Sequence, residues 1–199
     1  FKNNTETVHI LVSEAAKNLE KIIELGVDFD KNSEGDYHRT LEGGHCRHRI
    51  FHHKDATGFE ILTKLLATVQ QLPNVTILEN TFLSNIKKTS TGFSVDTFST
   101  SDCTQRQSYN SHFLILGTGG IGRVYDYTTN SAIATGDGIQ FAYNMGADIQ
   151  HLSYVQFHPT AFADHENREC FLVSEAVRGE GAYLLNCNKE RFMHKYEPE

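Results

Sequence analysis

The stretch EGGHCRHRIFHH, residues 42–53, places four histidines, one cysteine, two arginines and one glutamate within twelve positions. Side chains of these types either bind a transition metal or make a surface electropositive. A zinc site needs closely spaced ligands, usually with a second thiolate or a carboxylate. The histidines at 45, 48, 52 and 53 lack such a partner at ligand spacing. We therefore expect no metal and interpret the stretch as an electropositive loop, with a histidine-based metal protein as an alternative.

Two glycine-containing segments could hold a nucleotide. In LGTGGIGRVY, residues 116–125, glycines 117, 119 and 122 have the spacing of a nucleotide-binding loop, whose N–H groups can hold phosphate or ribose oxygens. The following residues do not have the pattern of the helix that this motif requires, so a plain turn stays an alternative. In TTNSAIATGDGIQFA, residues 128–142, Asp137 begins a helix and either caps it or binds a ribose hydroxyl.

Polar side chains also gather in VQFHPT and SEAVRGEGA. In an extended segment Gln156, His158 and Thr160 share one face. The second motif adds Ser174 and Glu175 in one short stretch, followed by an arginine and a glutamate. Polar groups beside apolar neighbours suit a pocket for a small anion, whereas the alternative is a solvated edge strand.

The composition limits the class of protein. The chain has 199 residues and a net charge of −7, which makes nucleic-acid binding through general phosphate attraction unexpected. Four cysteines without a CxxC pair favour a reducing compartment, and no apolar run is long enough to span a membrane. We predict a soluble, cytoplasmic protein. Because the chain begins with Phe1 and its opening residues carry no glycine-rich turn, we expect a fragment of a longer protein.

Helical spacing of apolar residues predicts a helix at 6–25 with Gly26 as its C-cap glycine. A second helix is expected at 58–72, capped by Asp55 or Thr57 and stopped by Pro73. Shorter helical stretches are expected at 138–145, closed by a glycine, and within 171–179.

Alternating and β-branched residues predict strands between and after the helices. A small antiparallel meander is expected from four segments: 75–80, 82–88, 92–99 and 105–113. The apolar run that continues through HFLILGTGG, residues 112–120, predicts a strand buried on both faces of an α/β sheet. A strand with a loop is expected at 148–162, and a last strand at 183–187. The expected fold class is α/β with α+β elements.

Six motifs together resemble a known family. EGGHCRHRIFHHKDATG, LGTGGIGRVYDYTTN, ATGDGIQFAYNMGA, VQFHPTAF, FLVSEAVRGEGAYL and RFM occur in an order and spacing similar to those of the L-aspartate oxidases. That family belongs to the flavoprotein group that includes the succinate dehydrogenase and fumarate reductase flavoprotein subunits. The resemblance covers nearly the whole chain. Glu42 separates the oxidases from their relatives, which usually carry an aromatic residue at this position.

The carboxylate of Glu42 also has a physical reason of its own. Succinate carries two carboxylates and no cation, whereas aspartate adds an α-ammonium group that needs an anionic acceptor away from water. One carboxylate at the mouth of the site can therefore select the amino acid. The alternative is that Glu42 is an exposed turn residue before two glycines.

The resemblance implies a Rossmann-like FAD-binding domain with an antiparallel meander over residues 1–151, and the start of a capping, substrate-binding domain over 152–199. It implies non-covalent FAD held by four residues: Leu83, Thr118, Gly119 and Asp137. It implies a dicarboxylate held by six: Glu42, Gln156, His158, Thr160, Ser174 and Glu175. The arginine that acts as acid and base in the family is expected beyond the C-terminus, so no catalytic residue is assigned.

The implied reaction is the oxidation of L-aspartate to iminoaspartate, with oxygen or fumarate as electron acceptor, in quinolinate and NAD biosynthesis. The product would pass to quinolinate synthase. Because the family's N-terminal GxGxxG is absent from these residues, we expect the chain by itself to retain no FAD and to be inactive. Cys46 and Gly117 also replace a common serine and a common alanine. The alternatives are a fumarate reductase or succinate dehydrogenase subunit and a non-catalytic α/β binding module.

Overall fold

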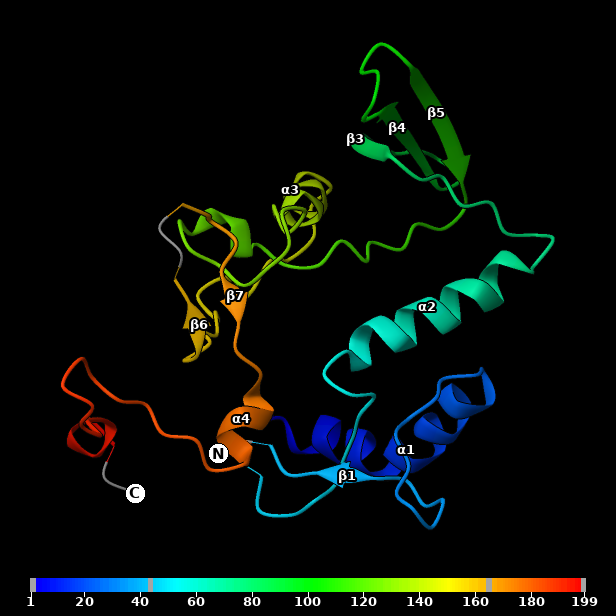
Figure 1. The fold of residues 1–199 in the computed structure, drawn as a ribbon. Coiled ribbons are helices and arrows are strands. Elements are labelled where there is room, and N and C mark those ends of the chain that lie inside the picture. The colour runs from blue at the N-terminus through cyan, green and yellow to red at the C-terminus, as the bar shows by residue number, and fades with distance from the viewer. Residues whose placement is uncertain (1–2, 43–44, 164–165, 198–199) are drawn as a thin grey trace. The chain divides into compact units, whose positions relative to one another are not determined.

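The computed structural model describes residues 3–42, 45–163 and 166–197. The chain mixes helices and strands, as the fold class predicted, and divides into two compact units (Figure 1). Unit 1 comprises residues 1–77 and 174–199, and unit 2 comprises residues 78–173. The two units are defined by how compactly their residues pack and not by what they bind. The predicted boundary near residue 151, between a cofactor domain and a capping domain, therefore stays a prediction.

Unit 1 begins with helix α1, Thr5–Glu24, which confirms the helix predicted at 6–25. The Asn4 side chain caps it by accepting the Thr7 N–H at 3.0 Å. Gly26 follows the last turn with a φ of +95°, a backbone conformation that glycine adopts without steric cost.

Helix α2, Thr57–Gln70, confirms the second predicted helix, but the predicted caps are wrong. Its N-cap is Ala56, which makes no side-chain cap hydrogen bond. The Thr57 hydroxyl instead accepts the His53 N–H at 3.1 Å, and Asp55 makes no cap. The hydroxyl therefore ties the histidine-rich stretch to the helix that follows it.

The histidine-rich stretch is anchored by a short antiparallel ladder between β1, Arg39–Thr40, and β2, Ile50–Phe51. Beside it, the buried Phe29 ring contacts the rings of Tyr37 and Phe51 edge-on, with centroids 6.5 and 5.6 Å away. Residues 41–49 form the connection, and Glu42 lies two residues after the end of β1. The anchor is small, but it fixes both ends of this connection.

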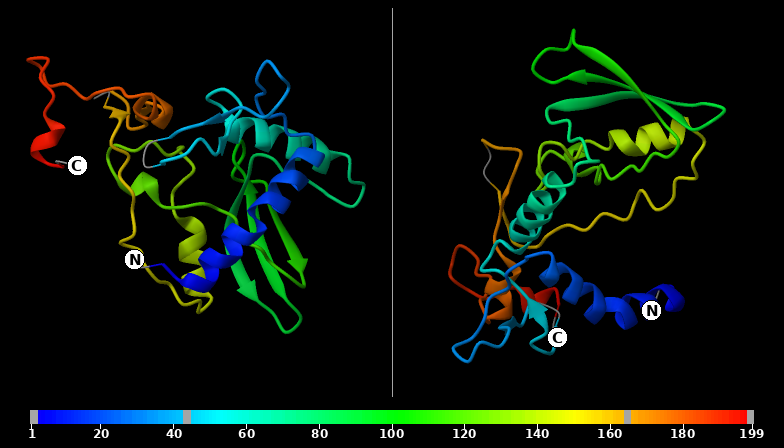
Figure 2. Two further views of the ribbon diagram at one scale, coloured as in Figure 1. Left: turned by 90° about the horizontal axis from the view of Figure 1, so that it is seen from below. Right: turned by 90° about the vertical axis from the view of Figure 1, so that its right-hand side faces the viewer.

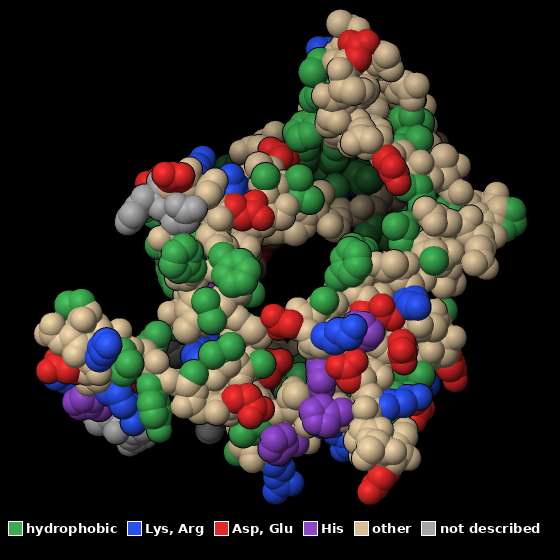
Figure 3. All heavy atoms as spheres, in the orientation of Figure 1, with side chains coloured by type: hydrophobic (Ala, Val, Ile, Leu, Met, Phe, Trp, Pro, Cys, Tyr) green, Lys and Arg blue, Asp and Glu red, His purple; other side chains and the backbone are tan. Residues whose placement is uncertain are grey.

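Asp30 is the hub of a hydrogen-bond network beneath the same stretch. Its carboxylate accepts the Lys54 N–H at 2.7 Å and lies 3.2 Å from His52 Nδ1. The other nitrogen of His52 is 2.7 Å from His38 Nδ1, and His53 Nδ1 is 2.7 Å from the Asp28 carbonyl oxygen. Several histidines of this face gather near β1 in Figure 3. His52 and His53 therefore have structural partners.

Unit 2 contains the antiparallel meander β3–β4–β5, built from Thr81–Lys88, Phe93–Ser99 and Arg106–Ser111. Three of the four predicted strand segments are confirmed, whereas residues 75–80 form no strand. The pairing register of β3 with β4 shifts between Leu83 and Asn85, which marks a bulge at the start of the sheet. Ile86 and Thr97 are the buried side chains of the meander.

The strand predicted within residues 112–120 is wrong for the structure described here. The segment is extended without ladder partners, and Phe113 and Ile115 are 87% and 92% exposed. A strand is buried on both faces only when neighbouring strands and helices cover it, and none of the described strands pairs with this one. The apolar run is present, but the layers that would bury it are not among these residues.

The remaining elements are short. Unit 2 has a 3₁₀ turn at Gly122–Val124, helix α3 at Asp137–Asn144, and the pair β6–β7 at Ala161–Phe162 and Phe171–Leu172. Unit 1 ends with helix α4 at Glu175–Gly179 and a 3₁₀ turn at Met193–Lys195. The strand predicted at 183–187 is reduced to one bridge between Leu185 and Arg191. Within the described residues, no helix is both long and apolar enough to cross a membrane.

The Asp30 network predicts an acid-sensitive contribution to the stability of unit 1. The Lys54 N–H, helped by His52 and His53, lowers the pKa of Asp30 below its ordinary value of 3.8. Because the folded pKa is depressed, the contribution is complete above pH 3.8 and is lost as the pH falls through the folded pKa. We expect Asp30→Asn to lower the midpoint of thermal unfolding at neutral pH, and the difference from wild type to shrink below pH 3.8.

Asp28→Asn is the matched control, because Asp28 takes part in this network through its backbone carbonyl. Equal unfolding midpoints for wild type and Asp30→Asn at neutral pH would contradict the prediction.

Candidate cofactor and substrate sites

A cavity of about 570 Å³ lies in unit 2 between the start of β3 and helix α3. Figure 2 shows α3 beside the meander in both views. Three of the four residues predicted to hold the cofactor line this cavity: Leu83, Thr118 and Asp137. The sequence did not identify its apolar walls, which come from Phe82, Ala132, Ile133 and Phe141. The sequence did carry one signal for them, because Ile133 is an apolar residue three positions before Gly136. In the structure its side chain is 83% exposed.

The fourth predicted residue, Gly119, does not line this cavity. Its φ of +73° makes it the turning point of the glycine segment. The next residue, Gly120, lines a separate cavity of about 360 Å³ together with Gln156 and Tyr154.

Helix α3 meets the glycine segment without room for a further carbon atom. A Cβ at Gly138 would lie 1.8 Å from Thr118 Oγ1 and 2.9 Å from Thr118 Cβ. The helix has Gly136 as N-cap and no side-chain cap, so the predicted capping role of Asp137 is wrong. The Asp137 carboxylate accepts the Thr135 hydroxyl instead. The first main-chain N–H groups of a helix have no acceptor within it, so they remain for a ligand or water.

His158 and Gln156 line a third cavity of unit 2, of about 230 Å³, facing Tyr125 and Asn130. The Thr160 N–H donates to His158 Nδ1 at 3.3 Å, so the neutral ring carries its proton on Nε2. The Thr160 hydroxyl lies 3.1 Å from the Val173 carbonyl oxygen, to which it donates. Thr160 therefore orients the ring and is not itself part of the cavity wall, whereas His158 has an N–H suited to a carboxylate.

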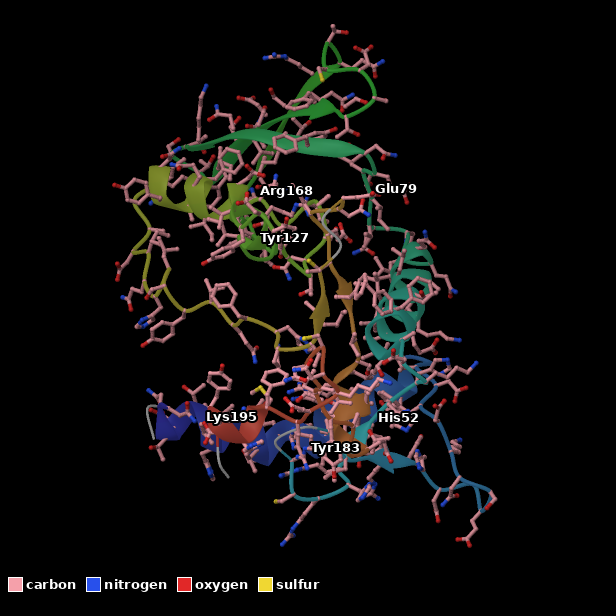
Figure 4. The ribbon with its side chains drawn as sticks, turned by 60° about the vertical axis from the view of Figure 1, so that its left-hand side comes forward. His52, Glu79, Tyr127, Arg168, Tyr183 and Lys195 are labelled. Atoms are coloured by element: carbon pink, nitrogen blue, oxygen red, sulfur yellow. The ribbon has the colours of Figure 1, made fainter. Side chains whose placement is uncertain are left out.

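Arg168 supports the opposite wall of that cavity and was not identified from the sequence. Its guanidinium donates to the carbonyl oxygens of Tyr125 at 3.0 Å, Arg123 at 3.2 Å and Asp126 at 3.4 Å. Figure 4 shows Arg168 and Tyr127 in the same part of the structure. One side chain thus holds the short backbone stretch 123–126, of which Tyr125 lines the cavity with His158.

The other predicted substrate residues lie in unit 1, at the start of α4 and on the connection after β1, two elements labelled in Figure 1. Ser174 Oγ caps α4 by accepting the Ala176 N–H at 3.3 Å, and Glu175 pairs with Arg178 at 3.4 Å. The backbone of Leu41 and Glu42 packs against Gly179, the last residue of α4. The structure therefore places Glu42 beside the helix of Ser174 and Glu175. Gly43 and Gly44, which follow in the motif, lie outside the described residues.

Metal ligands do not converge in the described part of either unit. Across residues 3–42, 45–163 and 166–197, no group of three or more His, Cys, Asp or Glu side chains has the geometry to hold an ion. The exposed His45 and His48 lie in the connection between β1 and β2.

The whole chain is similar in sequence to known proteins. The chain is 40% identical over 199 residues to L-aspartate oxidase of Clostridium perfringens. The matched region covers all of this chain and 45% of that protein. It is 36% identical to the chloroplastic L-aspartate oxidase 2-b of Nicotiana tabacum, covering 96% of this chain and 31% of that protein. The chain thus spans less than half the length of these curated relatives.

Solved structures show the same fold. The chain superimposes on E. coli quinol fumarate reductase FrdA with a TM-score of 0.83 and 26% identity, covering 93% of this chain and 31% of that one. For Mycobacterium smegmatis Sdh1 the TM-score is 0.72 at 25% identity, covering 93% and 33%. The sequence model of the FAD binding domain family matches residues 1–199. With that match over its full length, the chain belongs to the FAD-binding domain family.

Proposed function

We propose that the whole protein is an FAD-dependent oxidoreductase that oxidises L-aspartate to iminoaspartate. The observation that carries this proposal is the packing of the Glu42 backbone against the end of α4, which brings Glu42 beside the helix of Ser174 and Glu175. The relatives named L-aspartate oxidase, at 34–40% identity, support the same substrate.

The residues of unit 2 fit FAD. The cavity between β3 and α3 has apolar walls suited to an aromatic ring system, and Asp137 supplies a carboxylate that can accept a ribose hydroxyl. The uncapped N-terminus of α3 leaves main-chain N–H groups for oxygen atoms of the cofactor. We propose Leu83, Thr118 and Asp137 as cofactor contacts, with Gly119 turning the backbone toward the same region.

FAD, when bound, supplies a hydride acceptor for the substrate's Cα–H. The protein's part is to orient the diacid. We propose that His158 donates its Nε2–H to a substrate carboxylate, because Thr160 holds the ring with Nδ1 as acceptor. Gln156 lies in the same cavity wall and adds an amide donor. Ser174 and Glu175, at the start of α4 in unit 1, are further proposed substrate contacts.

Glu42 decides which diacid binds. The α-ammonium group of aspartate loses water on entering the site and gains a charge-assisted hydrogen bond from a carboxylate acceptor. Succinate has no cation, so the same carboxylate would repel it. The basic side chains after Glu42, at Arg47 and Arg49, are exposed and make the approach favourable for an anionic substrate in a protein of net charge −7.

Oxygen or fumarate is the proposed electron acceptor, and the proposed product, iminoaspartate, is a precursor for quinolinate and NAD. Hand-over to quinolinate synthase follows from that chemistry. We propose a cytoplasmic location, which fits the four free cysteines, three of them exposed.

A fumarate reductase or succinate dehydrogenase subunit is the second candidate, favoured by the TM-score of 0.83 to quinol fumarate reductase. Glu42 argues against it for the electrostatic reason above. A non-catalytic binding module is the third, and it would bind no flavin.

The electrostatic role of Glu42 predicts the effect of Glu42→Gln in the full-length protein. We expect kcat/KM for L-aspartate to fall about tenfold or more, because a charge-assisted hydrogen bond is replaced by a neutral one. Succinate binding is expected to be unchanged or tighter. Steady-state kinetics and ligand titrations measure both, with the exposed Glu34→Gln as a charge-matched control. An unchanged preference between the two diacids would refute the proposal.

The fit of α3 against the glycine segment predicts the effect of Gly138→Ala. The new methyl group would overlap Thr118 Oγ1 and Cβ, so the wall of the cavity must move. We expect FAD affinity to fall about tenfold, with a lower ratio of flavin to protein absorbance after purification. Gly58→Ala is the control, because no atom lies within 4 Å of a Cβ at that position. Full flavin content in Gly138→Ala would show that the cavity is not the cofactor site.

We further propose that a polypeptide of these 199 residues alone does not retain FAD and is inactive. The reason is that more than half of the length of the relatives lies outside the part that these residues match. The expected result is a colourless purified polypeptide. A stoichiometric yellow chromophore would contradict this.

A further inference from the structure

We propose that Gly179 is a specificity-positioning residue: the missing side chain lets the end of α4 contact the Leu41–Glu42 backbone and so sets where the Glu42 carboxylate lies. This inference rests on the proposed function, because it assigns to Glu42 the recognition of the substrate's ammonium group.

The atoms that Gly179 contacts are backbone atoms of Leu41 and Glu42. A Cβ there would lie 2.2 Å from the Leu41 carbonyl oxygen and 3.1 Å from both Leu41 C and Glu42 Cα. A carbonyl oxygen cannot rotate away as the end of a long side chain can, so any residue with a Cβ must displace the backbone of Glu42 or of α4. The requirement for glycine is therefore one of space.

Helix α4 keeps its own shape through local contacts. Ser174 caps its first turn, and Glu175 and Arg178 pair across it at 3.4 Å. Its last turn is closed by the Glu180 N–H, which donates to the Ala176 carbonyl at 2.9 Å. A methyl group at position 179 would therefore change the distance between the helix and the Leu41–Glu42 backbone before it changes the helix itself.

The connection that carries Glu42 has more contacts at its two ends than in its middle. The pairing of β1 with β2 fixes its two ends, and the Asp30 network reinforces the end at β2. Between these ends, the Glu42 carbonyl accepts the His45 N–H at 3.0 Å. A methyl group at position 179 would therefore move Glu42 relative to α4 by roughly 1 Å, a displacement large enough to weaken a directional contact ten- to a hundredfold.

The experiment uses the full-length, FAD-loaded protein and compares L-aspartate with succinate. Dissociation constants come from ligand-induced changes in flavin absorbance, and kcat/KM for L-aspartate from steady-state kinetics. In Gly179→Ala we expect the preference for L-aspartate over succinate to fall about tenfold or more, while succinate affinity and flavin content stay within twofold of wild type. Gly58→Ala, at an open position of α2, is the control.

A double-mutant cycle separates positioning from general damage. If Gly179 acts through Glu42, then Gly179→Ala causes no further loss of preference when Glu42→Gln is already present. A purely structural role would lower the affinity for both diacids alike in either background.

Leu41→Gly tests the same contact without crowding it, because it loosens the backbone before Glu42, and it decides the matter if Gly179→Ala does not fold. It too should lower the preference only while Glu42 is intact. If Leu41→Gly or a folded Gly179→Ala keeps the wild-type preference for L-aspartate over succinate, the inference about Gly179 is overturned and the proposed function is not. A wild-type protein without any preference for L-aspartate overturns the proposed function as well.

Discussion

Two glycines with no room for a methyl group govern the geometry of both candidate sites. Gly138 lets α3 approach Thr118 in unit 2, and Gly179 lets α4 meet the backbone that carries Glu42 in unit 1. In each case a helix end comes close to a segment that bears a functional group, and the absent side chain makes the approach possible. The cofactor cavity in unit 2 and the proposed position of Glu42 in unit 1 thus each depend on a glycine that allows close packing.

Around these contacts, hydrogen bonds orient the polar groups. Thr160 determines which nitrogen of His158 carries the proton, and Arg168 holds the facing backbone through three carbonyl oxygens. Asp30 does the equivalent work in unit 1 by ordering the residues that follow β2. The histidines that suggested a metal site therefore divide into two groups. His52 and His53 support structure, whereas His45 and His48 are exposed in the connection.

Local patterns predicted the local elements well. Apolar spacing located α1 and α2, alternation located β3, β4 and β5, and a glycine marked the end of α3, because these signals depend on neighbours a few residues apart. The caps were predicted poorly. Asp55, Thr57 and Asp137 have cap chemistry at suitable places, but neither α2 nor α3 has a side-chain cap. Thr57 and Asp137 are hydrogen-bonded to other partners. The strand expected at 112–120 failed because burial on two faces needs layers that the described residues do not supply.

The sequence by itself determined the chemical inventory: a carboxylate before two glycines, a histidine two residues before a threonine, and glycine turns of nucleotide-binding type. Motif order was enough to indicate the flavoprotein family, which the family match then showed over residues 1–199. Only the tertiary structure decided which of these groups meet. It joined Leu83 to Thr118 and Asp137 around one cavity, and it brought Glu42 to α4 across more than a hundred residues of chain. Such contacts depend on packing between distant segments, which no local pattern encodes.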